Sequence, residues 1–155
     1  MGVYSSTLNG VFSDEKRCQD DATGYGGLGM ASNQVEHWDI ADRLTMQLKK
    51  IFKHPNARVG MELPSEFGKE KGYYIYDVGI QVDSNNLFVV ELCHNDNFDE
   101  SVKRIKGSFR KYKTVQECFI YNYETAQWFK VDKHGNLDYG NSFSTFLNVD
   151  LNTLI

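Results

Sequence analysis

The sequence predicts an α/β protein, α+β in strict usage, in which one mixed β-sheet is flanked by helices. Two amphipathic segments alternate with short runs rich in β-branched and aromatic residues, in the order α-β-β-β-α-β-β. The 155 residues are enough for a single hydrophobic core. Hydrophobic residues make up 41% of the chain and charged residues 25%, which is typical of a globular domain.

Charge and composition limit the kinds of molecule that the protein is expected to bind. The net charge of −4 argues against a broad basic surface for nucleic acid, although it leaves room for a local basic groove. No apolar run has membrane-spanning length, and the N-terminus lacks a secretion signal. Cys18, Cys93 and Cys118 are far apart and odd in number, which favours free thiols. We therefore expect a cytoplasmic protein without a membrane partner.

The first 33 residues are expected to form a flexible arm. They contain the glycine-rich stretch TGYGGLGM at 23–30. A phosphate-binding loop would need a strand before it and a Lys-Ser or Lys-Thr pair after it, and neither is present. Glycine-rich sequence without periodicity is typical of a linker or arm. Residues 34–155 are then expected to form one domain with an apolar C-terminal tail.

The segment SNQVEHWDIADRLTMQLKKIFKHP, residues 32–55, predicts an amphipathic helix. Glu36 lies near its start, and His54-Pro55 ends it. Its apolar residues recur at three- and four-residue steps, as on one face of a helix: Val35, Trp38, Ile40, Ala41, Leu44, Leu48, Ile51 and Phe52.

Three strands are expected next, at residues 57–64, 72–83 and 86–93. The last two are separated by DSNN at 83–86, which predicts an antiparallel hairpin. A second helix follows at 97–113, with Val102, Ile105 and Phe109 facing the sheet. Two more strands are expected within 115–132, around a turn at 123–125, and residues 141–155 form the tail.

Side-chain alternation brings two carboxylates together. In the strand at 72–83 the even residues from Tyr74 to Val82 form the core face, including Tyr76. Asp77 is on the other face, as is Glu91 in the next strand. The expected turn places Asp77 across from Glu91 or Cys93, so the two acids are direct or diagonal neighbours.

Two neighbouring carboxylates in an apolar setting need compensation by a proton, a basic residue or a divalent metal. Oxygen ligands favour Mg²⁺ or Mn²⁺. A permanent pair with Lys or Arg would make a metal unnecessary. The residues alone leave both alternatives open.

The string YYIYDVGIQVDSNNLFVVELC, at 73–93, with a helix before it and a basic helix after it, resembles the PD-(D/E)xK nuclease superfamily, whose fold is restriction-endonuclease-like. The resemblance covers roughly residues 34–131. It implies that Asp77 and Glu91 are the two acids of the motif and that Glu36 is a third metal ligand. Members of this superfamily often form dimers, so a homodimer is one expected state.

Cys93 stands where the superfamily has lysine. The chain also resembles a branch of small stand-alone restriction-endonuclease-like proteins, in which the following helix supplies the lysine. Lys106 before Phe109, the strand ECFIYN at 117–122 and the tail FSTFLNVDL at 143–151 match that branch, and so does His37. The resemblance thus implies a displaced catalytic lysine, Lys106, with Lys103 as the alternative.

The expected function is a metal-dependent phosphodiesterase, a DNA endonuclease that uses Asp77, Glu91 and Lys106. Lys103, Arg104 and Arg110 on the second helix are candidates for binding nucleic acid. The alternative is a nuclease fold that has lost catalysis and serves as a nucleic-acid- or protein-binding regulatory module, which the cysteine at 93 and the acidic net charge favour.

A cysteine nucleophile is a weaker alternative. Cys93 and His94 are adjacent in a strand and point to opposite faces, so they cannot form a catalytic dyad. His37 or His134 would have to act as the base instead.

Overall fold

The computed structural model of the chain describes residues 32–63 and 75–155. The chain divides into two compact units, residues 1–36 and 37–155, and every described strand belongs to the second. The expected arm, with its glycine-rich stretch, lies outside the described residues except for Ser32 and Asn33, which begin the first helix. Among the described residues, no helix is long and apolar enough to cross a membrane.

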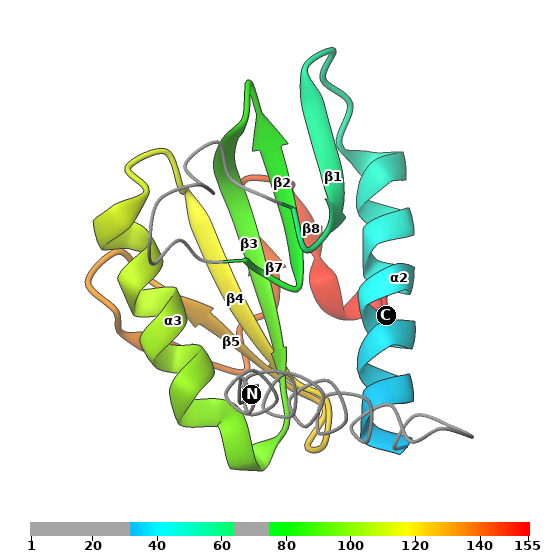
Figure 1. Cartoon of the computed structure of the whole chain (residues 1–155), viewed down its shortest axis with the longest axis vertical. Coiled ribbons are helices and arrows are strands. Elements are labelled where there is room, and N and C mark those ends of the chain that lie inside the picture. The colour runs from blue at the N-terminus through cyan, green and yellow to red at the C-terminus, as the bar shows by residue number, and fades with distance from the viewer. Residues whose placement is uncertain (1–31, 64–74) are drawn as a thin grey trace, which may run out of the picture. The chain divides into compact units, whose positions relative to one another are not determined.

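The described residues form an α+β fold, with a mixed six-stranded sheet and two α-helices (Figure 1). The sheet has the order β1-β2-β3-β4-β5-β6, in which β3 and β4 are parallel and all other neighbours are antiparallel. The elements are α2 (Ser32–Ile51), β1 (Ala57–Met61), β2 (Val78–Val82), β3 (Asn85–Cys93), α3 (Phe98–Lys111), β4 (Glu117–Asn122), β5 (Gln127–Val131), β6 (Leu137–Tyr139), β7 (Phe143–Ser144) and β8 (Val149–Asp150). Short 3₁₀ turns at Asn95–Asn97 and Leu151–Thr153 complete them.

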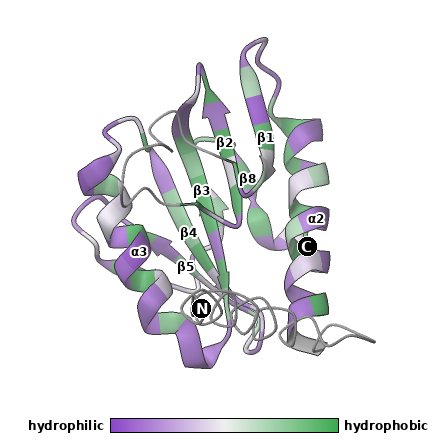
Figure 2. Ribbon diagram, viewed as in Figure 1, coloured by the Kyte–Doolittle hydropathy of each residue, from purple (hydrophilic) through white to green (hydrophobic). Residues whose placement is uncertain are grey.

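Helix α2 packs on one face of the sheet. Its buried residues Ala41, Leu44 and Leu48 follow the three- and four-residue spacing predicted from the sequence. They share a core cluster with Phe88 and Val90 of β3. Figure 2 shows hydrophobic residues predominating in β2 and β3, whereas both helices mix hydrophilic and hydrophobic residues. The expected first helix is therefore confirmed, although it ends at Ile51, and Val35 and Ile51 of its expected apolar face are exposed.

Helix α3 packs on the opposite face of the sheet, as Figure 1 shows. Ile105 shares a second core cluster with Val89 and Cys93, the β3 residues of opposite parity to the α2 cluster. Val102 and Phe109 are only partly buried, while Ser101 and Ser108 are buried. The buried stripe of α3 is thus rotated from the expected one, toward the side that carries residues 101, 104, 105 and 108.

The C-terminal segment is more structured than an apolar tail. Strand β6 extends the sheet, and β7 and β8 form a separate two-stranded ribbon. Phe146 and Leu151 pack into the α2 core cluster, so the tail does find the apolar surface it was expected to need. Buried Glu117 of β4 anchors this segment by accepting hydrogen bonds from Ser144 Oγ at 2.6 Å and Thr145 N at 3.0 Å.

The hairpin between β2 and β3 sets the register of the acids. Its turn consists of Asp83 and Ser84, with φ of 50° and 64°, the left-handed values of a two-residue type I′ turn. A bulge between Ile80 and Gln81 then shifts the pairing by one residue, so that Val78 lies opposite Val90. The bulge compensates for this two-residue turn, which is one residue shorter than the three-residue turn that the sequence predicts.

The prediction that Tyr76 lies on the same face of the sheet as Val78 is wrong. Tyr76 packs in the α3 cluster, whereas Val78 packs in the α2 cluster. The reason is that β2 begins at Val78 and the chain bends at Asp77, so the alternation of the strand does not extend back to Tyr76. The earlier part of the expected strand, up to residue 74, lies outside the described residues.

Candidate functional site

Asp77 and Glu91 are brought together as the sequence predicts. Val78, the first residue of β2, pairs with Val90 in an antiparallel ladder, and Asp77 precedes it at a bend in the chain, next to this pairing. Asp77 Oδ2 accepts a hydrogen bond of 2.7 Å from the backbone N–H of Leu92. The Asp77 side chain is 18% exposed and that of Glu91 is 2% exposed. The two acids thus lie at the boundary between the core and solvent.

Glu91 is held in an electrostatically unfavourable place. Burial is the main cause that raises its pKa to about 8, and the neighbouring negative charge of Asp77 is the second. Arg104 opposes both, because its Nη1 donates a hydrogen bond of 3.1 Å to Glu91 Oε2. The other carboxylate oxygen, Oε1, is buried without a hydrogen-bond partner. Glu91 therefore retains an acceptor that nothing among the described residues satisfies.

Arg104 is the cation that reaches the acid pair. It lies beside the buried stripe of α3, between Ser101 and Ser108, whose small side chains leave room next to it. Tyr76 Oη donates to Ser108 Oγ at 2.6 Å, and Ser108 Oγ donates to the carbonyl of Arg104 at 3.0 Å. This chain of hydrogen bonds links the turn of α3 that carries Arg104 to the residue next to Asp77.

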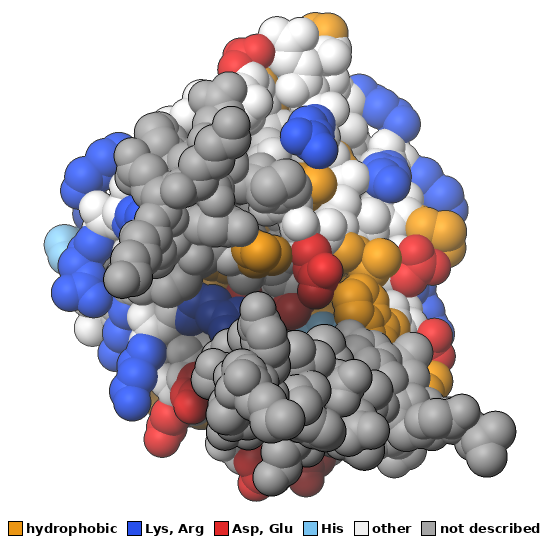
Figure 3. Space-filling model, in the orientation of Figure 1, with side chains coloured by type: hydrophobic (Ala, Val, Ile, Leu, Met, Phe, Trp, Pro, Cys, Tyr) orange, Lys and Arg blue, Asp and Glu red, His pale blue; other side chains and the backbone are white. Residues whose placement is uncertain are grey.

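His37 of α2 completes the neighbourhood of Asp77. Its Nε2 lies 3.3 Å from Asp77 Oδ1, and its ring lies edge-on to the ring of Tyr123, with centroids 6.0 Å apart. Asp77 thus has a partner on each oxygen, His37 on Oδ1 and the Leu92 N–H on Oδ2. Figure 3 shows acidic, basic and histidine side chains close together on this face of the molecule.

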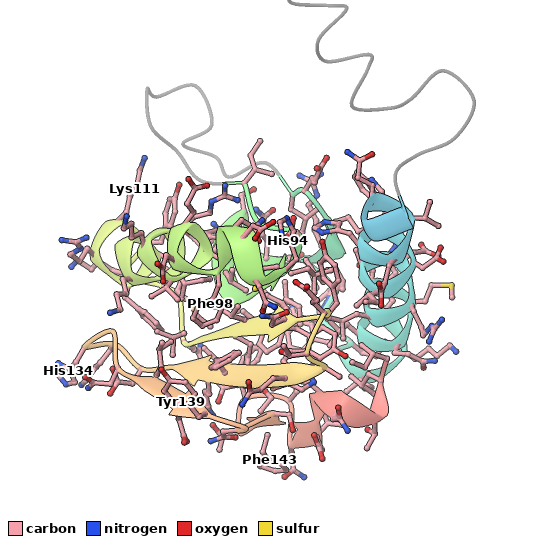
Figure 4. All side chains as sticks on the ribbon, turned by 90° about the horizontal axis from the view of Figure 1, so that it is seen from below. His94, Phe98, Lys111, His134, Tyr139 and Phe143 are labelled. Atoms are coloured by element: carbon pink, nitrogen blue, oxygen red, sulfur yellow. The ribbon has the colours of Figure 1, made fainter. Side chains whose placement is uncertain are left out.

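Cys93 is a buried thiol. It is fully inaccessible, and burial, followed by the charges of Glu91 and Asp77, raises its pKa to about 12. A thiolate nucleophile is thereby disfavoured. His94 turns toward Tyr123, with ring centroids 6.2 Å apart, while Cys93 packs with Ile105. Figure 4 shows His94 near the start of α3 and His134 at the far side of the molecule, on the turn between β5 and β6.

The expectation that Lys106 serves the acids is corrected by its position. The stem of Lys106 lies against Gly135, between β5 and β6: a Cβ placed on Gly135 would be 3.0 Å from Lys106 Cγ. Lys106 follows Arg104 by two residues, which is about 200° around the helix. Since Arg104 points to Glu91, Lys106 must project from the other flank. Lys103 and Arg110, expected to bind nucleic acid, are exposed on α3.

Glu36 was expected to be a third ligand beside Asp77 and Glu91. It is exposed on α2. Within residues 32–63 and 75–155, no group of three or more His, Cys, Asp and Glu side chains is arranged to hold a metal ion. The described site therefore offers two carboxylates rather than the three-acid set.

Two residues were not assigned to the acid pair by sequence reasoning. His37 was noted only through the family resemblance, yet it precedes buried Ala41 by one helical turn and so lies on the face that packs on the sheet. Arg104 was assigned to nucleic-acid binding, although its spacing of three to Ser101 and four to Ser108 places it beside the buried stripe. For both residues, the helical periodicity of the sequence indicated that the side chain lies at the side of the helix that packs on the sheet.

No protein-family model matches the chain, and no curated protein is similar enough to count as a match. The site is defined by its geometry alone: two neighbouring acids, one of them buried, with an arginine and a histidine as partners.

Proposed function

We propose that the chain is a metal-dependent phosphodiesterase of the restriction-endonuclease-like type, acting on DNA. The observation that supports this best is the buried, unpartnered Oε1 of Glu91 beside Asp77. Two adjacent carboxylates that repel each other and lack full compensation match the donor chemistry of Mg²⁺ or Mn²⁺. These ions commonly take one or two carboxylates from a protein.

Asp77 and Glu91 are the residues that would hold the metal. His37 and the Leu92 N–H orient Asp77, while Arg104 fixes Oε2 of Glu91 and leaves Oε1 free. The bound ion would supply Lewis-acid polarisation of a phosphate oxygen.

Arg104 takes the role that the resemblance assigned to Lys106. Its contact with Glu91 uses one of the five N–H donors of a guanidinium, and its side chain is 44% exposed. The remaining donors can bind the non-bridging oxygens of a phosphodiester and stabilise the charge that develops during hydrolysis. A thiol at position 93 could not supply this positive charge.

Cleavage of plasmid and single-stranded DNA, with Mg²⁺ or Mn²⁺, tests the proposal. Asp77→Asn should abolish cleavage, and Arg104→Ala should slow it by about 10²–10³-fold. Lys106→Ala should retain most of the activity, and Lys133→Ala is a control with the same change of charge. The proposed role of Arg104 would be overturned if Arg104→Ala kept full cleavage activity while Lys106→Ala lost it.

A second candidate function is a nuclease fold without catalysis, which binds nucleic acid or protein. The Arg104–Glu91 and His37–Asp77 contacts favour it, because each acid already has a basic partner. The absence of metal-dependent cleavage by the wild-type protein on every substrate tested, together with DNA binding in the presence of a chelator, would support this candidate over the phosphodiesterase.

A further inference from the structure

A second candidate site lies at the other end of α2. It is a pocket of about 820 Å³ between the C-terminal end of α2 and the edge strand β1. Among the described residues, its lining includes four basic side chains, Lys49, Lys53, His54 and Arg58, and no acidic one. Lys49 follows His37 by twelve residues, about 18 Å of helix, so this pocket is distinct from the acid pair.

The basic side chains come from two different elements. Lys49 and Lys53 belong to the end of α2 or follow it, where positive charge complements the helix dipole. Lys53 Nζ serves this purpose by donating to the Lys49 carbonyl at 2.6 Å. The dipole does not account for Arg58, which is exposed on β1. Figure 3 shows Lys and Arg side chains gathered over this end of α2 and β1.

These charges are not neutralised within the described parts of the chain. None of the ion pairs formed there involves Lys49, Lys53 or Arg58. An ammonium has three donors, so Lys53 keeps two after its bond to the Lys49 carbonyl. Like charges that converge on one pocket repel each other, and an anion would relieve that repulsion.

The other described residues of the lining are apolar. Phe52, Val59 and Leu63 contribute to it, and half-buried Phe52 is held in place by its ring contact with Phe146, with centroids 5.4 Å apart. An aromatic and aliphatic wall beside several cations suits a ligand in which a phosphate is joined to a flat ring. Aromatic side chains stack on nucleobases, and Lys and Arg bind phosphate.

We propose that this pocket binds a nucleotide, with Lys53 and Arg58 on its phosphate and Phe52 against its base. The ligand is either a free mononucleotide or a nucleotide unit of a nucleic-acid strand, since both present the same chemistry. The assignment does not depend on hydrolysis at Asp77 and Glu91.

Isothermal titration of the full chain in EDTA tests the assignment, with AMP, a short oligo-dT and inorganic phosphate as probes. We expect AMP or oligo-dT to bind, and binding of oligo-dT without AMP would identify the source as a nucleic-acid strand. The Lys53→Ala/Arg58→Ala variant should bind at least about tenfold more weakly, because two charge-assisted contacts are lost. Lys133→Ala, outside the pocket, should bind as the wild type does, and so should Asp77→Asn.

Arg58→Glu provides a second variant, because Arg58 is exposed and its change should not affect folding, which thermal unfolding checks. It should also lose binding. The assignment is overturned if neither AMP nor oligo-dT binds, or if both pocket variants bind like the wild type. Inorganic phosphate that binds as tightly as AMP would overturn the role of the apolar wall. Loss of DNA cleavage in Asp77→Asn with intact AMP binding separates this site from the proposed phosphodiesterase.

Discussion

Arg104 Nη1 lies 3.1 Å from Glu91 Oε2, and this contact joins the one nearly inaccessible acid of the site to a half-exposed cation. The carboxylate is 2% exposed, whereas the arginine side chain is 44% exposed. Solvent screens the arginine and reduces the amount by which its positive charge lowers the pKa of Glu91. Burial of Glu91, followed by the negative charge of Asp77, therefore raises its pKa despite the ion pair.

The raised pKa of Glu91 predicts a pH-dependent stability difference. In the unfolded chain the pKa is near 4.5, and in the folded chain it is about 8, so the folded state binds more protons between these values. Stability that is present below pH 4.5 is lost as the pH rises toward 8. A glutamine at position 91 does not titrate, so Glu91→Gln does not lose stability in this way. The unfolding free energy of the variant minus that of the wild type should therefore increase with pH, by at most about 1.4 kcal/mol per pH unit.

Urea denaturation at several pH values, in the presence of a chelator, measures this difference. Glu100→Gln, an exposed substitution on α3, serves as the control. A difference between Glu91→Gln and the wild type that stays constant from pH 5 to pH 8 would show that Glu91 titrates normally.

Mg²⁺ or Mn²⁺ should stabilise the wild-type protein. A metal that binds only the folded state at a hundredfold excess over its Kd adds about 2.7 kcal/mol. Asp77→Asn removes one of the two carboxylates and should lose most of this gain, whereas Asp42→Asn, on the exposed side of α2, should keep it. Thermal unfolding with increasing metal measures the effect, and equal gains in all three proteins would argue against a metal at the acid pair.

Cys93→Lys should not restore a conventional motif. Cys93 is fully buried beside Ile105, so a lysine there would have to bury its charge or displace the packing around it. We expect a loss of about 3 kcal/mol or more in unfolding free energy. Cys93→Ala should cost much less, and chemical denaturation of the two variants compares them. Near-native stability of Cys93→Lys would mean that the site admits a lysine directly.

Glu117 should make the C-terminal segment sensitive to acid. Burial would raise its pKa, but hydrogen bonds from Lys130, Ser144 and Thr145 outweigh that effect and lower it. A lowered folded-state pKa stabilises the protein above the unfolded value, and this stabilisation is lost as the pH falls through the folded value.

Glu117→Gln should therefore cost about 1–3 kcal/mol at pH 7 and progressively less in acid. Denaturation at pH 7 and pH 4 measures this, again with Glu100→Gln as the control. A cost that is the same at both pH values would indicate that packing, and not charge, anchors the segment.

Much of the fold follows from local sequence patterns. The three- and four-residue spacing of Ala41, Leu44 and Leu48 identified α2 and its buried face. Residues 83–86 predicted the hairpin, although the structure has a shorter turn and a compensating bulge. The strand at 137–139 and the ribbon of β7 and β8 were missed, because strands of two or three residues carry no periodicity that can be recognised.

The sequence by itself indicated that Asp77 and Glu91 are neighbours, because a short turn between two strands leaves few registers. Only the tertiary structure decided which cation meets them. Lys106 and Arg104 lie two residues apart on one basic helix, and the rotation of that helix on the sheet selects between them. That rotation depends on the packing of Ser101, Ile105 and Ser108 against distant strands, which no local pattern encodes.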